Sequence, residues 1–171
     1  MSTHLESPIE WNLVLETVRR VPHYSGQVSI EKQWIDPALS RPICLFVRTY
    51  RLSEVKQLVA SYAEYQIPLF ESAWLSKDDA PRRMLLPPIL EVHQDQCVVI
   101  DGHHRIYEAI QQHQSAVLVL IIKGQLDKLP ADVLSWDEVA ITNQRLPREL
   151  KFRNFRSSNF RLINEFIDNF H

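Results

Sequence analysis

One stretch decides the expected fold, Val98-Val99-Ile100-Asp101-Gly102-His103-His104-Arg105-Ile106-Tyr107-Glu108-Ala109-Ile110. A β-branched run ends in Asp-Gly, and a helical pattern of apolar residues begins directly after it. A helix start presents free backbone N–H groups and a partial positive charge, which favour a bound phosphate. The stretch therefore predicts a strand-to-helix junction that holds an anion beside an acid or a base.

The side chains of this junction are the candidate site residues. Gly102 would let the backbone approach a phosphate closely, and Arg105 on the first helical turn would grip it with its guanidinium. His104 is the expected phosphate contact and proton carrier, while His103 is either a second phosphate contact or a structural residue. Asp101 is expected to bind Mg²⁺ or to accept a hydroxyl proton, the alternative being that it only caps the helix.

Composition narrows the class of protein. With 171 residues, 45% of them hydrophobic, the chain is expected to form one domain with a substantial core. The net charge of −2 shows no overall basic bias toward nucleic acid. Cys44 and Cys97 lie in apolar runs, which favours free thiols in a reducing cytoplasm over a disulfide. The residues from Met1 to Glu6 lack a signal-peptide pattern, and no apolar run reaches the ~20 residues of a membrane span.

The spacing of apolar residues and the positions of prolines predict the other elements. The chain has only three glycines, so prolines mark most of the element ends. Ser7-Pro8-Ile9-Glu10 is typical of a capping box, and Ser53 is a candidate cap for a helix that ends before Pro68. The predicted helices span 8–20, 53 to about 66, 103 to about 113, and a terminal stretch with Phe160, Ile163, Phe166, Ile167 and Phe170, capped by Ser157, Ser158 or Asn159. The predicted strands span 28–34, 43–47, 85–92, 97–100 and a doubly buried 116–122, with a loop at 76–83 and either a strand or a short helix at 133–141.

From about Leu85 to Lys123 the order of elements resembles the ParB/sulfiredoxin superfamily. The matching residues are Pro88-Ile89-Leu90-Glu91-Val92 and Asp101-Gly102-His103-His104-Arg105. The resemblance implies an α/β fold, a small mixed sheet flanked by helices, which binds a nucleotide phosphate at the junction. We expect residues 1–171 to form a single such domain, with added N- and C-terminal helices and a C-terminal appendage at about 145–171.

The branches of this superfamily differ in chemistry. Sulfiredoxins have a cysteine where this chain has His103, so sulfinic acid reduction is not expected. The residues after Lys123 are too few for the DNA-binding part of ParB proteins, which bind CTP. Asp-Gly-His-His-Arg is most similar to the free serine kinases, which phosphorylate L-serine with ADP or ATP. This similarity implies Mg²⁺ and an upstream glutamate that acts with Asp101, for which Glu31, Glu54 and Glu71 are the candidates.

Two functions stay open at this point. The first is a nucleotide-dependent phosphotransferase acting on a small hydroxyl compound such as free serine, and the second is a non-catalytic nucleotide-binding regulator or DNA-associated module. The basic segment 145–156, which contains Phe152 and Phe155, could follow a nucleic-acid backbone while stacking bases. The favoured interpretation of this segment is an ordinary amphipathic one, with basic side chains in water and phenylalanines in the core.

Overall fold

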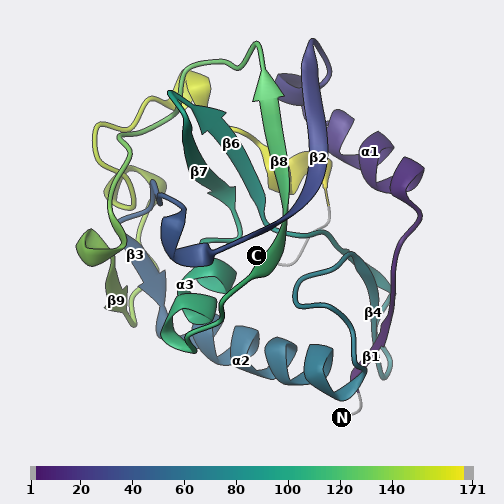
Figure 1. Cartoon of the computed structure of the whole chain (residues 1–171). Coiled ribbons are helices and arrows are strands. Elements are labelled where there is room, and N and C mark those ends of the chain that lie inside the picture. Colours follow the sequence, from purple (N-terminus) through teal and green to yellow (C-terminus); the bar gives the residue numbers. More distant parts are fainter. Residues whose placement is uncertain (1–2, 168–171) are drawn as a thin grey trace.

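A four-stranded mixed sheet forms the centre of the protein, as a computed structural model that describes residues 3–167 shows (Figure 1). Its strand order is β2 (Val28–Ile35), β8 (Val117–Gly124), β6 (Ile89–His93) and β7 (Gln96–Asp101). Strand β8 runs antiparallel to β2 and parallel to β6, and β6 and β7 form an antiparallel hairpin. The α/β class predicted from the sequence is confirmed.

Strand β8 is buried on both faces, as its unbroken apolar run predicted. Successive side chains of a strand point to opposite faces, so β8 supplies two cores at once. Val117, Val119 and Ile121 enter one core, and Leu120 and Ile122 enter the other. The helices of the fold divide between these two faces.

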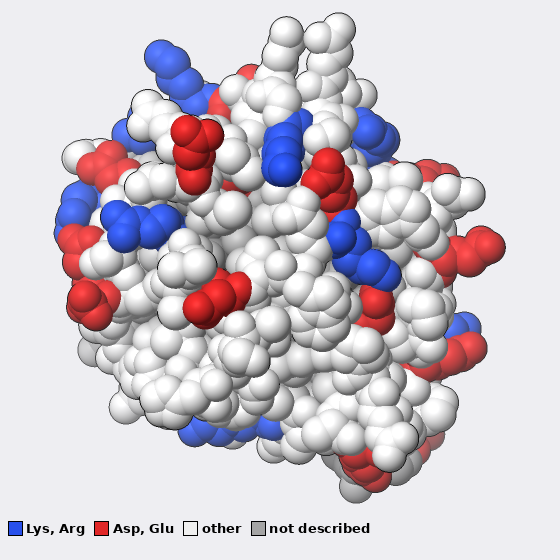
Figure 2. Space-filling model, viewed as in Figure 1, with Lys and Arg blue, Asp and Glu red and all other residues white. Residues whose placement is uncertain are grey.

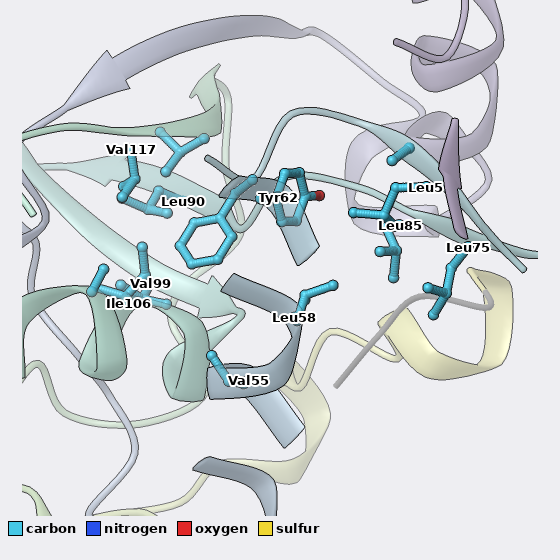
Figure 3. Packing of buried hydrophobic residues seen from close by; sticks show 14 of the residues in the cluster. Leu5, Val55, Leu58, Tyr62, Leu75, Leu85, Leu90, Val99, Ile106 and Val117 are labelled. Atoms are coloured by element: carbon cyan, nitrogen blue, oxygen red, sulfur yellow. The ribbon is translucent and has the colours of Figure 1, made fainter. Parts of the chain in front are cut away.

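The first core lies between the sheet and two helices, α2 (Thr49–Glu64) and α3 (His103–Gln111), which lie side by side in Figure 1. Val55 and Leu58 of α2 and Ile106 of α3 belong to one buried cluster with the strand residues Leu90 and Val99, and Figure 3 shows Ile106 directly beside Val99. Helix α3 is thereby held against the strand that precedes it. This packing fixes the direction in which the start of α3 points.

The second core lies on the opposite face, under α1 (Trp11–Arg19) and the short α4 (Ile163–Phe166). Helix α1 begins later than predicted, and the expected capping box at Ser7 is wrong. The Ser7 hydroxyl instead donates to the carbonyl of Ser72 at 2.6 Å, so it is not available to cap a helix. Helix α4 is a single turn that starts after Leu162, and Ser157–Asn159 form a separate 3₁₀ turn.

A buried ion pair fastens the segment before α4 to the central sheet. Glu91 of β6 is fully buried, and Arg161 donates to both of its carboxylate oxygens, from Nε at 2.9 Å and from Nη2 at 2.8 Å. Tyr24 Oη donates to the same carboxylate at 2.6 Å, and His93 Nε2 lies 2.8 Å from it. Burial alone would raise the pKa of Glu91, but the hydrogen bonds from His93, Arg161 and Tyr24 hold it below its usual value. We call these four residues the Glu91 clasp.

Two smaller sheets complete the fold. One is antiparallel, with the order β1 (Thr3–Glu6), β4 (Ala73–Lys77) and β5 (Arg83–Leu85), so strands occupy both ends of the predicted loop at 76–83. The other pairs β3 (Phe46–Arg48) with β9 (Ala140–Thr142) in parallel. This pairing brings the chain just before α2 next to the C-terminal third of the protein.

Several predicted boundaries need correction. Helix α2 begins at Thr49, with Ser53 exposed in its interior, and β3 covers only the end of the predicted strand at 43–47. The stretch at 133–141, expected to be either a strand or a short helix, contains both a 3₁₀ turn at Trp136–Glu138 and the start of β9. Phe170 lies outside the described residues.

The surface carries charges of both signs. Figure 2 shows Lys and Arg interspersed with Asp and Glu on the face seen in Figure 1, which fits the small net charge. Cys44 is buried and Cys97 half-buried, and both are free thiols as predicted. None of the helices in residues 3–167 has the length and apolar character of a membrane span.

Candidate anion-binding pocket

The predicted junction lines a cavity of about 320 Å³, within the size range of small-molecule sites. All five residues from Asp101 to Arg105 contribute to its wall. The other side of the cavity is formed by the chain around β3, the start of α2, and the segment after β9. The structure therefore brings the candidate site residues together at one hollow.

Gly102 makes the turn from β7 into α3, and its backbone requires glycine. Its φ is +93°, and a Cβ atom there would lie 2.8 Å from the Cβ of Pro88. The first i→i−4 bond of the helix runs from the N–H of Ile106 to the carbonyl of Gly102 at 3.0 Å. The N–H groups of residues 103–105 precede that bond and have no acceptor within the helix, so this end of α3 is suited to an anion.

Arg105 lies at the floor of the pocket, where it is only 1% exposed. Its Nη1 donates to the carbonyl of Leu86 at 2.6 Å, and its Nη2 lies 3.5 Å from Asp101 Oδ2. Its Nε and Nη2 have no hydrogen-bond acceptor among the described residues. Burial lowers the pKa of Arg105, and the nearby Asp101 opposes that shift. The guanidinium is thus anchored in the protein, and its two nitrogens without an acceptor are themselves buried from solvent.

Both histidines of the junction use Nε2 to accept a backbone hydrogen bond. His103 accepts from the N–H of Ile43 at 3.3 Å, and His104 accepts from the N–H of Arg48 at 3.0 Å. Burial lowers the pKa of His103 to about 4. Burial, followed by the charges of His103, Arg48 and other nearby cations, lowers the pKa of His104 to about 3. Both rings are therefore neutral at pH 7.

Four further basic side chains line the pocket, and the sequence analysis did not assign any of them to it. Arg48 and Arg51 come from the start of α2, and Arg145 and Lys151 come from the segment after β9. Burial lowers the pKa of Lys151, and Arg48, Arg145 and Arg148 lower it further. The basic residues of the two walls therefore lie close enough to repel one another. With Arg105 the described lining has five basic residues, against Asp101 as its one acidic residue.

The three candidate glutamates lie elsewhere. Glu31 lies 3.6 Å from Lys123, and Glu71 pairs with Lys32 at 2.9 Å. Glu54 pairs with Arg51 at 2.8 Å, but it is not part of the pocket wall. No group of three or more His, Cys, Asp or Glu side chains within residues 3–167 has a geometry that could hold a metal ion.

The basic segment 145–156 both lines the pocket and packs its phenylalanines against each other. Arg145, Leu146, Lys151 and Phe152 line the pocket. Phe152 and Phe155 stack on each other with ring centroids 5.3 Å apart, as expected for an amphipathic segment that packs its phenylalanines together. The basic composition of this segment was a usable signal for two of the pocket cations. Nothing in the sequence placed it beside α2, because that placement depends on the β3–β9 pairing.

Comparisons with protein-family models, with curated proteins and with solved structures found no match.

Proposed function

We propose that the protein binds a phosphate-bearing small molecule, with a nucleotide as the favoured ligand, in the pocket at the start of α3. One observation carries the proposal: among the described residues, five basic side chains from three separate segments line a single cavity with one acidic residue. The donor-rich end of α3 opens into the same cavity. The resemblance of the junction to the ParB/sulfiredoxin superfamily supports a nucleotide phosphate in particular.

The charge arrangement favours a ligand with several negative charges. Arg48 and Arg145 each repel the charge of Lys151, and Asp101 is the one carboxylate among the described lining residues of the pocket. A phosphate chain would relieve that repulsion, because arginine donates to phosphate oxygens in a bidentate manner. The free N–H groups at the start of α3 would bind the same anion from the other side of the cavity.

A phosphotransferase is the second candidate, and the position of Asp101 favours it. Asp101 is the acidic residue of the pocket wall and lies beside the helix start where the phosphate would bind. It would accept the proton of an acceptor hydroxyl while the hydroxyl oxygen bonds to the terminal phosphorus of the donor and the bond from that phosphorus to the leaving ADP (from ATP) or AMP (from ADP) breaks. Asp101 would hold Mg²⁺ only together with the phosphates of the ligand and water.

Isothermal calorimetry with ATP, ADP, CTP, GTP and inorganic pyrophosphate, with and without Mg²⁺, tests the binding. The wild-type protein is expected to bind at least one of them, and Arg145→Ala and Lys151→Ala are each expected to weaken binding by about tenfold, or 1.4 kcal/mol. Arg20→Ala is the matched control, because Arg20 is an exposed residue at the end of α1. Absence of binding to every compound, or equal binding by all three variants, would refute the proposal.

Phosphorus NMR separates the two candidates. Incubation with ATP or ADP and L-serine is expected to give a phosphoserine signal only if the protein is a phosphotransferase. In that case Asp101→Asn retains nucleotide binding and loses turnover. Binding without any transfer product from serine would favour the regulator, or an acceptor other than serine.

A further inference from the structure

The two histidines of the junction face a segment that carries part of the cationic wall. Residues 43–48 run past the start of α3, and Arg48 ends this segment as the N-cap of α2. The N–H groups at its two ends, those of Ile43 and Arg48, donate to His103 Nε2 and His104 Nε2. The contacts thus join the two sides of the pocket directly.

We infer that His103 and His104 are positioning residues that fasten segment 43–48 to α3, so that Arg48 and Arg51 face the anion. The inference rests on the proposed anion-binding function. It differs from the expectation that His104 contacts phosphate itself. In the inferred role, the essential atom of each ring is Nε2, and its partner is the protein backbone.

The geometry explains why imidazoles occupy these positions. The start of a helix presents N–H donors, and the edge of segment 43–48 that faces it presents N–H donors as well. Donors facing donors need an acceptor between them, and the backbone at a helix start does not supply one. A neutral imidazole provides such an acceptor on one nitrogen and keeps its proton on the other.

The opposite edge of the segment is held by β9. Phe46 pairs with Ala140 and Arg48 with Thr142, and the N–H of Ala140 donates to the carbonyl of Leu45 at 2.9 Å. The N–H of Leu45 also donates to the carbonyl of Lys151 at 2.8 Å, so segment 43–48 lies between the two rings on one side and β9 and Lys151 on the other. Loss of the His104 ring would remove the acceptor of the Arg48 N–H, and loss of the His103 ring would remove the acceptor of the Ile43 N–H at the other end of the segment.

Two substitutions of His104 separate positioning from direct phosphate contact. His104→Gln places an amide oxygen near the position of Nε2 and so keeps the acceptor for Arg48. His104→Asn keeps a donor near the position of Nδ1 but does not reach the Arg48 N–H. Positioning requires that Gln replaces His better than Asn does, whereas phosphate contact through Nδ1–H requires the reverse.

The experiment measures ATP and pyrophosphate binding by calorimetry, and amide exchange at Arg48 by NMR without ligand. His104→Gln is expected to bind within about threefold of wild type, and His104→Asn more than about tenfold more weakly, with faster Arg48 exchange. His113→Gln, which alters an exposed residue after α3, is the control. Equal or tighter binding by His104→Asn than by His104→Gln would overturn the inference.

A third readout needs no variant. Nitrogen-15 NMR of the wild-type protein is expected to show His103 and His104 with the proton on Nδ1, and the Nε2–H form of His104 would overturn the inference. If wild-type protein bound neither ATP nor pyrophosphate, the proposed function would fail. The exchange and tautomer data would still decide whether the histidines hold segment 43–48.

Discussion

Replacement of Arg161 by methionine tests the Glu91 clasp. Methionine keeps much of the apolar stem and removes the guanidinium, so the fully buried carboxylate of Glu91 retains only Tyr24 and His93. The guanidinium also donates to the carbonyls of Asp127, Lys128 and Asn159, each within 2.6–2.8 Å. Removal of one partner from a buried ion pair costs about 3–5 kcal/mol. For a chain of this size, we expect the melting temperature to fall by about 6–20 °C.

Urea unfolding followed by circular dichroism at pH 7 measures this loss. Arg156→Met is the matched control, because Arg156 lies in the same part of the chain with its charge exposed near Asp132, where an ion pair contributes about 0–1 kcal/mol. A second variant, Arg161→Met with Glu91→Gln, is expected to recover part of the stability because it no longer buries an unpaired charge.

The result that would refute the reasoning is a loss in Arg161→Met no greater than in Arg156→Met. The clasp would then contribute no more than a surface pair. A double variant as unstable as Arg161→Met alone would also count against it, because the buried charge of Glu91 would not be the cause of the loss.

Three further outcomes are expected. The pKa of Glu91 is lowered in the fold, so its ionised carboxylate contributes to the free energy of unfolding above pH 4.5, and this contribution is lost as the pH falls through the folded pKa. Melting curves recorded from pH 7 to 3 are expected to show the loss of stability in acid, and Glu91→Gln is expected to make the melting temperature less dependent on pH. Gly102→Ala is expected to cost about 1–3 kcal/mol in urea unfolding, owing to its φ of +93° and the clash with Pro88, whereas Gly26→Ala, with open space around it, is expected to cost less than about 1 kcal/mol. Leu90→Ala in the first core is expected to cost about 2–5 kcal/mol, and a loss below about 1 kcal/mol would contradict the packing described.

Local patterns predicted the elements whose burial dominates their sequence. The unbroken apolar run of β8 and the helical spacing of α3 both had the predicted structure, since each buries a face that the sequence displays. Helix starts were less predictable. Ser7 and Ser53 looked like caps, but one hydroxyl bonds to Ser72 and the other lies inside α2, and sequence alone does not show such competition.

The candidate site was predictable only on one of its sides. Asp101 to Arg105 follow one another in sequence, so their common position at the pocket could be expected from a single motif. Arg105 is more deeply buried than a surface clamp would be, because it bonds to Leu86 from a neighbouring segment. Arg105→Ala is therefore a poor test of ligand binding, since it would also disturb the fold. The cations of the opposite wall could not be assigned to the site from the sequence, because their position depends on a contact between residues that are far apart in the chain.

The parallel pairing of β3 with β9 has a consequence for folding kinetics. It joins residue 46 to residue 140, a contact of high sequence separation that is slow to form because a long loop must close first. The pocket is therefore complete only after both parts of the chain have docked. A ligand bound between them would act as a reversible cross-link, and its main kinetic effect is expected on the unfolding rate rather than on the folding rate.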